Sequence, residues 1–452
     1  FRRILMQTTA VSHQTTSPSR RKEIWGWYLY DFGNSAYAAV VLLAVYSAYF
    51  QGTVVGGAEG SRLWGISVGI AMLVVAIISP VLGSIADFSG SKKRFLFLFT
   101  AIACVFTATL FFVQAGDVVL GMTLFIMAEI GYRASQVYYN GLLPEIARPA
   151  EMGRISGNGW AIGSAGGIVC LLIVLPLIVI VGGGFVVRLS LLITAVFFAL
   201  SALPLFLWVR ERAQPQPLPP GSNIITIGFQ RLWQTVKKAR HYREFIKFMI
   251  AFLIFNDGII MALDFAAIIG TVLFGMEQQG LIIFIIIVQI TSVAGAYVFG
   301  ITTDRWSGKQ ALIISLLLMI AAVVWLFFAT SQTIFFVIGA LAGFALTGVQ
   351  SVSRTMVGKL SPPGQSAEFY GLFAVAGRTS SFIGPTLYGI FAAEIALLYA
   401  AEGKTAVTAE QLGQRAAILT IAVFLIVGLL LLLWVNEKRG IEAAHGGLEI
   451  GD

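Results

Sequence analysis

The chain has 452 residues, of which 58% are hydrophobic and only 12% are charged. Soluble globular domains carry about a quarter charged residues, so this composition excludes an exterior solvated by water and makes lipid the expected solvent. The formal net charge is +8. It does not indicate nucleic acid binding, because the basic residues lie in short loops between apolar runs, where they set the orientation of a membrane protein.

Apolar runs long enough to cross a bilayer, about 20 residues each, recur in two groups of six. The runs lie near 29–51, 64–86, 95–115, 118–140, 157–181 and 186–209, and then near 245–272, 280–302, 310–330, 332–352, 369–400 and 416–435. They predict an all-α membrane protein of twelve transmembrane helices. Its expected parts are a tail (1–28), a six-helix half (29–209), a linker (210–244), a second half (245–435) and a second tail (436–452).

The loops between the runs show a strong charge bias. If the N-terminus is cytoplasmic, nearly all Lys and Arg residues outside the runs fall on the cytoplasmic side, and only Arg62, Arg188, Lys404 and Arg415 fall on the other side. The positive-inside rule then predicts a multi-pass protein of the cell membrane with both termini in the cytoplasm. The first run lacks a small-residue cleavage site, so we expect it to be retained as a span.

The linker has a composition of its own. It is Pro-rich at 214–221 and basic after that, and Ile225, Phe229, Trp233 and Val236 recur in it at roughly helical spacing. Two interpretations fit this pattern. One is a short basic amphipathic helix on the membrane surface, and the other is a solvated linker.

A short motif after the second run recurs after the eighth. At one constant offset, Gly83, Asp87 and Lys92 are matched by Gly300, Asp304 and Lys309, with Arg305 inside the second copy. Two parallel six-helix halves are a known plan of transporters, with the substrate site between the halves near the midplane. We expect these loops to act as gates that hold one face closed and part as the halves rock. The alternative is that they are basic only because they face the cytoplasm.

With these motifs the chain resembles the major facilitator superfamily, whose loop signature is similar to the pattern Gly-x-x-x-Asp-(Arg)-x-x-Gly-Lys. Further stretches narrow the resemblance to its vacuole-effluxer-like branch, namely Tyr30–Tyr37, Tyr139–Ile146, Arg154–Ala161, Phe255–Gly258, Gly348–Arg354 and Pro362–Gly371. Fungal members of that branch are autophagy-related amino-acid effluxers. The resemblance implies a twelve-helix transporter fold and, for a fungal chain, the vacuolar membrane. Ser164 and Ala165 depart from the family pattern, which has a bulky aromatic residue and a Leu there.

Charged residues inside the runs are functional candidates, because a charge in a bilayer is costly unless it is paired or hydrated. Glu129 and Arg133 are four residues apart in the fourth run, in the order that favours an ion pair on a helix. We expect either a structural clamp, in which the two charges neutralise each other, or a coupling site. In the second case Glu129 takes a proton when Arg133 is drawn to an anionic substrate.

Two aspartates of the seventh run, Asp257 and Asp264, are seven residues apart and so share one helix face. No basic residue lies at their depth in this run, and burial favours a protonated carboxyl, as a proton-coupling site requires. We predict that Asp257 is the coupling residue. Hydration at a cavity mouth is the alternative, above all for Asp264. Asp31 and Asn34 in the first run and Asn256 in the seventh are further candidates for substrate, coupling or gating contacts.

The sequence has no features of an enzyme, a metal site or a cofactor site. The three histidines lie outside the apolar runs, and no phosphate-binding loop is present. We expect a monomeric secondary transporter that moves a small solute, such as an amino acid, by alternating access. Its expected partners are the solute, protons and the lipid bilayer. Efflux of amphipathic drugs or lysolipids, and a non-transporting receptor or scaffold on a transporter fold, are the alternative functions.

Overall fold

The computed structural model describes residues 18–147, 149–212, 223–362, 369–370, 372–373, 376–377 and 382–445. Over these residues the chain is helical and contains no β-strand. Twelve of the described helical segments are long and apolar enough to cross a membrane. The all-α class and the twelve spans expected from hydropathy are therefore confirmed.

The first half holds the first six spans. Its helices are α1 (Pro18–Tyr37), α3 (Gly57–Ser89), α4 (Lys92–Thr109), α5 (Val118–Ile146), α6 (Pro149–Ile180) and α7 (Gly183–Trp208). The first span continues beyond α1 through two π-helical segments, η1 (Ala38–Ala44) and η2 (Phe50–Val55), with α2 (Tyr46–Tyr49) between them. Hydropathy does not reveal such segments, which widen the helix and rotate the faces of the residues that follow.

The second half holds the other six spans. Its helices are α9 (Arg243–Asp264), α10 (Ala266–Phe274), α11 (Gln278–Arg305), α12 (Gly308–Phe328), α13 (Gln332–Leu360), α15 (Ile383–Ala401) and α16 (Ala406–Leu433), followed by the short α17 (Glu437–His445). The run expected over 245–272 is interrupted at Phe265, whose backbone (φ −106°, ψ 0°) leaves the helical region between α9 and α10. In the long run expected over 369–400, α15 begins only at Ile383, and residues 371, 374–375 and 378–381 before it lie outside the described residues.

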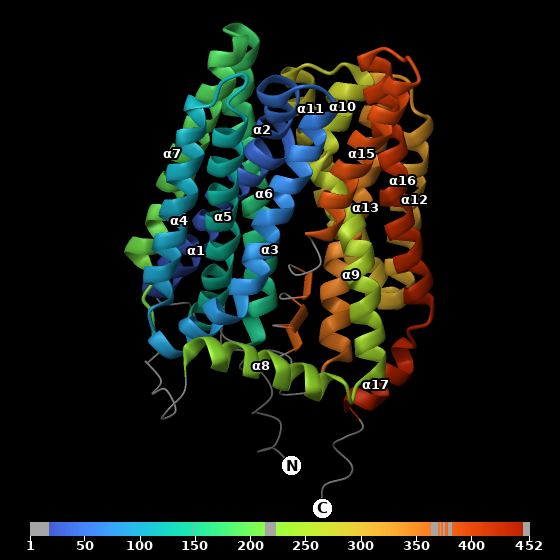
Figure 1. Cartoon of the computed structure of the whole chain (residues 1–452). Coiled ribbons are helices and arrows are strands. Elements are labelled where there is room, and N and C mark those ends of the chain that lie inside the picture. The colour runs from blue at the N-terminus through green and yellow to red at the C-terminus, as the bar shows by residue number, and fades with distance from the viewer. Residues whose placement is uncertain are drawn as a thin grey trace, which may run out of the picture.

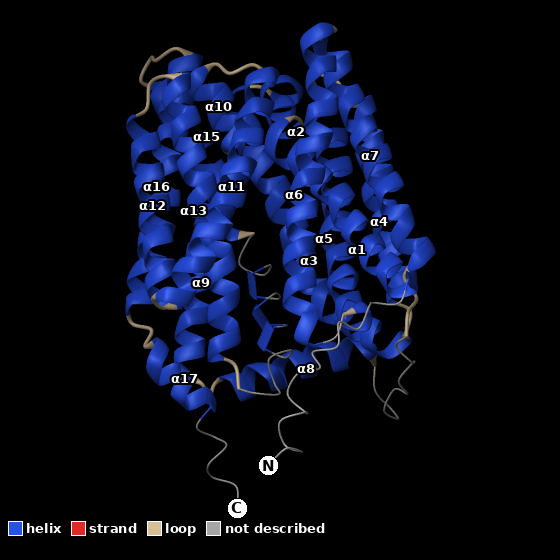
Figure 2. Ribbon diagram, turned by 180° about the vertical axis from the view of Figure 1, so that it is seen from behind, coloured by secondary structure: helices blue, strands red, loops and turns tan. Residues whose placement is uncertain are grey.

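The linker between the halves contains a helix, α8 (Ile224–Ala239). Figure 1 shows α8 running crosswise to the spans at the same end of the molecule as α17, and Figure 2 shows the same arrangement from behind. We call this end the linker side and the opposite end the far side. Of the two interpretations of the linker sequence, the structure therefore shows the helix. The Pro-rich stretch lies outside the described residues.

Glycines allow the helices of the first half to approach closely. An added Cβ at Gly159 would lie 2.3 Å from the ring of Trp27, and one at Gly166 would lie 2.0 Å from the carbonyl oxygen of Phe32. Small residues at such spacing permit backbone contact between membrane helices. The result is a tight α1–α6 pair that brings Asp31 and Asn34 to the boundary between the halves.

Candidate functional site

A cavity of about 420 Å³ lies between the two halves. Its polar lining comes from Asp31, Asn34, Ser35, Tyr132, Arg133, Gln136 and Ser164 in the first half, and from Asp264, Gln289, Ser292, Thr347 and Gln350 in the second. Apolar side chains, among them Leu42, Leu43, Phe284, Met319 and Leu346, complete the wall. Ser164, one of the two residues that depart from the pattern expected from the resemblance, lines this space.

The basic group of the cavity wall is Arg133. Its Nε donates to Oε1 of Glu129 at 2.6 Å, one helical turn earlier on α5. Glu129 is fully buried and does not line the cavity, whereas Arg133 does. The Arg133 guanidinium also lies over the ring of Tyr132, 5.3 Å from its centroid. The ion pair expected from the sequence is thus formed, and it fixes the guanidinium at the wall.

Asp264, the last residue of α9, lines the same cavity from the second half. Its side chain is buried and lines the cavity, and it lies within electrostatic range of Arg133. The indole Nε1 of Trp64 donates to the Asp264 carbonyl oxygen at 2.9 Å. The site therefore brings together a cation from the first half and a carboxylate from the second.

Three buried polar atoms of the lining have no hydrogen-bond partner among the described residues: Oδ2 of Asp264, Oδ1 of Asn34 and Nε2 of Gln289. Two of these atoms are acceptors and one is a donor. Buried polar groups in native structures are almost always hydrogen-bonded. A polar solute in the cavity could satisfy all three.

Asp31 lies nearer the linker side of the cavity. An added Cβ at Gly163 of α6 would lie 2.6 Å from Oδ2 of Asp31, so the carboxylate rests against that helix. The guanidinium of Arg354, on α13 of the other half, lies over the Trp160 ring at 5.1 Å and within electrostatic range of Asp31. Trp160 also lines the cavity. These residues form a charged contact between the halves on the linker side.

Asp257 and Asn256 are buried on α9 but do not line the cavity. Asn256 accepts from Nε2 of Gln350 at 3.2 Å, so it contacts the cavity wall indirectly. Asp257 packs against Gly384 of α15, where an added Cβ would lie 3.0 Å from its carbonyl oxygen. The structure thus gathers Asp31, Asn34, Arg133 and Asp264, with Glu129 behind Arg133, and places Asp257 away from them.

Polar contacts close the far side of the cavity. Nε2 of Gln51 donates to Glu410 at 2.6 Å, and Nε2 of Gln414 donates to Oγ of Ser61 at 2.6 Å. Arg62 forms an ion pair with Glu394 of α15. Each of these contacts joins one half to the other, so the far side cannot open until they break.

On the same side α3 and α15 touch through their backbones. An added Cβ at Gly65 would lie 2.4 Å from the carbonyl oxygen of Pro385, and one at Gly389 would lie 2.6 Å from the carbonyl oxygen of Ser61. Side chains at these glycines would hold the two helices apart.

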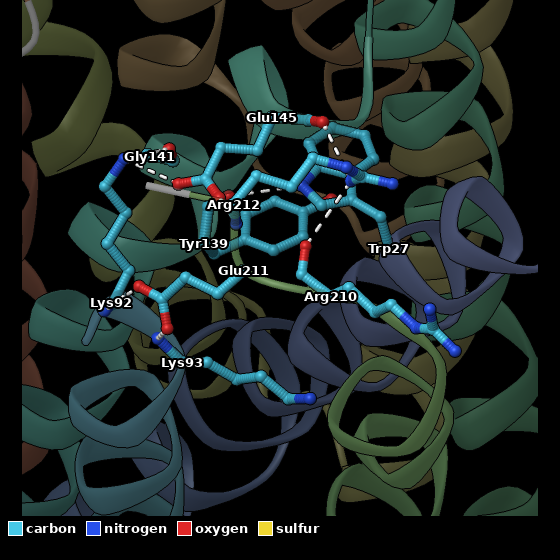
Figure 3. Close-up of polar contacts among 9 residues, drawn as sticks. All are labelled: Trp27, Lys92, Lys93, Tyr139, Gly141, Glu145, Arg210, Glu211 and Arg212. Carbon is cyan, nitrogen blue, oxygen red and sulfur yellow. Dashed lines mark hydrogen bonds and ion pairs between the residues drawn. The ribbon is translucent and has the colours of Figure 1, made fainter. Parts of the chain in front are cut away.

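A network on the linker side joins the helix ends of the first half (Figure 3). The carboxylate of Glu211, which follows α7, accepts from the backbone N–H groups of Lys92 and Lys93 at the start of α4, the second at 3.4 Å. Nζ of Lys92 lies 2.8 Å from Glu145 at the end of α5. Burial raises the pKa of Glu211, and the two backbone N–H groups oppose that rise.

Arg212 and Glu23 extend this network to α1. Nη2 of Arg212 lies 2.8 Å from Oε2 of Glu23, which is 1% exposed. The backbone N–H of Arg210 also reaches Glu23, at 3.4 Å. The start of the linker is thereby fixed to the first half.

The second half repeats this arrangement. Glu437, which follows α16, accepts from the backbone N–H groups of Gly308 at 3.1 Å and Lys309 at 2.8 Å, at the start of α12. The backbone N–H of Asn436 donates to Glu244 at 2.7 Å, as that of Arg210 does to Glu23. In each half, a glutamate after the sixth span caps the N-terminus of the third span. A second glutamate, near the start of the first span, accepts the backbone N–H of the residue that directly precedes the capping glutamate.

These glutamates are not among the residues expected from the sequence. The signal that could have found them is a Glu two residues beyond the last apolar position of both the sixth and the twelfth run. Of the expected gate residues, Lys92 reaches Glu145, and Nζ of Lys309 donates to the carbonyl oxygen of Leu433 at 2.8 Å. Arg305 is exposed at the end of α11. Gly83 and Asp87 end α3, and Gly300 and Asp304 lie near the end of α11, but their side chains lie outside what the structure describes.

The fold and the cavity together define a transporter of the major facilitator type. The chain belongs to the vacuole effluxer Atg22 like family, whose model matches residues 63–153 and 149–445. The transporter assignment, and with it the expectation of a non-enzymatic protein, is confirmed by these relationships.

Relatives of known sequence lie in bacteria and fungi. An uncharacterized MFS-type transporter, YxiO of Bacillus subtilis, is 26% identical over 93% of this chain and 96% of its own length. Autophagy-related protein 22-1 of Aspergillus niger is 26% identical over 64% of this chain, but the match spans only 48% of that protein. The chain thus matches about half the length of this fungal relative.

Solved structures share the fold at low identity. A bacterial homologue of the human lysosomal transporter Spinster, in an inward-facing and unoccupied conformation, superposes with a TM-score of 0.72 at 14% identity, over 95% of this chain and 99% of its own. The nucleoside transporter NupG gives a TM-score of 0.64 at 15% identity, over 92% of this chain and 98% of its own.

Proposed function

We propose that this chain transports a small zwitterionic solute, an α-amino acid with an uncharged side chain, through the cavity between its halves. The observation that carries the proposal is that Arg133 of the first half and Asp264 of the second half line the same cavity. A carboxylate of the solute binds the Arg133 guanidinium, and its ammonium group binds Asp264 and the free acceptor of Asn34. The apolar wall around Leu42 and Phe284 receives the side chain.

The contacts between the halves support a mechanism of alternating access. Polar contacts and glycine packing close the far side, whereas Arg354 over Trp160 joins the halves on the linker side. Only contacts that differ between two conformations can shift the equilibrium between them. We propose that the halves rock as rigid bodies, each held together by its glutamate caps, and that the linker side is cytoplasmic, as the distribution of Lys and Arg indicates.

We further propose that transport is coupled to protons through Asp264. Asp264 faces the cavity and the Arg133–Glu129 pair, so protonation of its carboxyl changes the charge that the solute meets. Asp257 does not face the cavity, which makes Asp264 the better candidate on geometric grounds. The sequence alone favours Asp257, and the comparison of the two residues is a direct test.

The test is solute uptake into proteoliposomes. Radiolabelled neutral, acidic and basic amino acids, a nucleoside and a lysophospholipid are offered with and without a proton gradient. We expect uptake of neutral amino acids that is lost in R133Q and retained in K404Q, an exposed control on the far side. Uptake of the nucleoside or lysophospholipid without amino acid uptake would overturn the substrate proposal.

A further inference from the structure

The helix α8 in the linker presents a face that no other described helix covers. Ile227 and Ala239 are buried against the protein, whereas Phe229 and Trp233 are 44% and 56% exposed. Phe229, Trp233 and Lys237 follow one another at four-residue steps and so share one side of the helix. The exposed side therefore begins with two aromatic rings and ends with a basic residue.

The charged residues of α8 are all basic. The segment Ile224–Ala239 contains no Asp or Glu. Lys237, Arg240 and Arg243 are exposed, and none of the described carboxylates forms an ion pair with them. The nearest acid along the chain, Glu244, is already bound by Lys247 at 2.7 Å. These cations are available to an external anion.

Position places this surface at the membrane boundary. Arg243 begins the seventh span, and three residues separate it from the end of α8, a distance of about 14 Å at most for an extended chain. Figure 1 shows α8 lying crosswise at the level where the spans end, beside α3 and the start of α9. Tryptophan favours the headgroup region of a bilayer, and basic side chains are attracted to anionic lipids there.

We infer that α8 is a binding surface for anionic phospholipids, with Phe229 and Trp233 inserted at the headgroup level and Lys237, Arg240 and Arg243 bound to lipid phosphates. The inference does not depend on which solute is transported. Because α8 connects the two halves, lipid bound there holds the connection in the plane of the membrane surface.

The experiment uses the full chain in vesicles. In a background that carries C104A and C170A, a nitroxide is attached to W233C or, as a matched control, to Q234C. Gln234 is also exposed but lies about 100° further round the helix. We would measure how often the nitroxide collides with oxygen, which is concentrated in lipid, and with a water-soluble nickel chelate. The vesicles are made of phosphatidylcholine, with and without phosphatidylglycerol.

We expect the label at 233 to favour oxygen, and to do so more strongly with phosphatidylglycerol, whereas the label at 234 favours the nickel chelate. The triple variant K237Q/R240Q/R243Q should remove the effect of phosphatidylglycerol, and K404Q should not. Added salt should weaken it, because screening shortens electrostatic range. Equal nickel access at both positions, or a phosphatidylglycerol effect that survives the triple variant, would overturn the inference.

Discussion

Glu437 caps the start of α12: its carboxylate accepts the backbone N–H of Lys309 at 2.8 Å. Glu211 makes the equivalent contact with Lys93 in the first half, at 3.4 Å. An anion at a helix N-terminus satisfies N–H groups that lack a partner within the helix and interacts favourably with the helix dipole. Both halves have this cap, although Glu211 and Glu437 are not separated by the sequence offset that relates the loop motifs.

Loss of the cap should destabilise the second half. Hydrogen bonds to a charged group are worth about 1.5–3 kcal/mol each, and Glu437 accepts two from the backbone. We expect Glu437→Ala to lower the melting temperature of the purified protein in detergent by several degrees. Glu442→Ala is the control, because Glu442 is exposed on the same short helix. Equal melting temperatures for the two variants would contradict the role of the cap.

Glu211 predicts a pH dependence of stability. Burial raises the pKa of Glu211 above its ordinary value of 4.5. A carboxyl with a raised pKa in the folded state binds more protons there than in the unfolded chain. Its contribution therefore falls as pH rises from about 4.5 through the raised pKa. We expect the stability of wild type relative to Glu211→Gln to decline across this window, measured by thermal melting at stepped pH. A difference that grows with pH would have the wrong sign.

The sequence predicts the fold well and the site only in part. Span number and the two halves follow from runs of about 20 apolar residues, which bilayer thickness enforces. The Glu129–Arg133 pair follows from helical spacing. Helical spacing does not decide between Asp257 and Asp264. Although the two residues share one face of α9, they meet different neighbours: Asp264 lines the cavity, whereas Asp257 packs against Gly384. The helix that a residue contacts depends on packing between segments that are distant in the sequence, and the pattern of a single sequence does not reveal it.

Asp264 and Asp257 should differ when each is neutralised. Asp264→Asn removes the only carboxylate that the described residues of the second half contribute to the cavity lining. We expect it to abolish proton-driven uptake in proteoliposomes. Solute binding should weaken but not disappear, because Arg133 still binds the solute carboxylate. Asp257→Asn should leave the pH dependence of uptake unchanged. If Asp257→Asn alone removed proton dependence, the coupling site would lie on the α15 side of α9.

The glycine contact on the far side should control opening there. Gly65→Val would place side-chain atoms against the backbone of Pro385 and so separate α3 from α15. Ser61→Cys, at a fully buried position beside this contact, serves as a reporter in a cysteine-free background. We expect Gly65→Val to speed its modification by a membrane-impermeant thiol reagent. Gly184→Val is the control, because a Cβ there meets nothing within 4 Å, and equal rates in the two variants would refute the far-side closure.

Arg354 and Trp160 should control opening on the linker side in the same way. Their contact joins α13 to α6 across the halves, and a cation over an aromatic ring contributes about 0.5–2 kcal/mol. If the contact is absent when the linker side is open, a loss of about 1 kcal/mol shifts the equilibrium roughly five-fold toward that state. We expect Arg354→Gln and Trp160→Leu each to speed modification of Ser35→Cys, a cavity residue, by a reagent supplied on the linker side. The double variant should add little to Arg354→Gln, because that change already removes the interaction with Trp160. Fully additive effects would show that the two residues act separately.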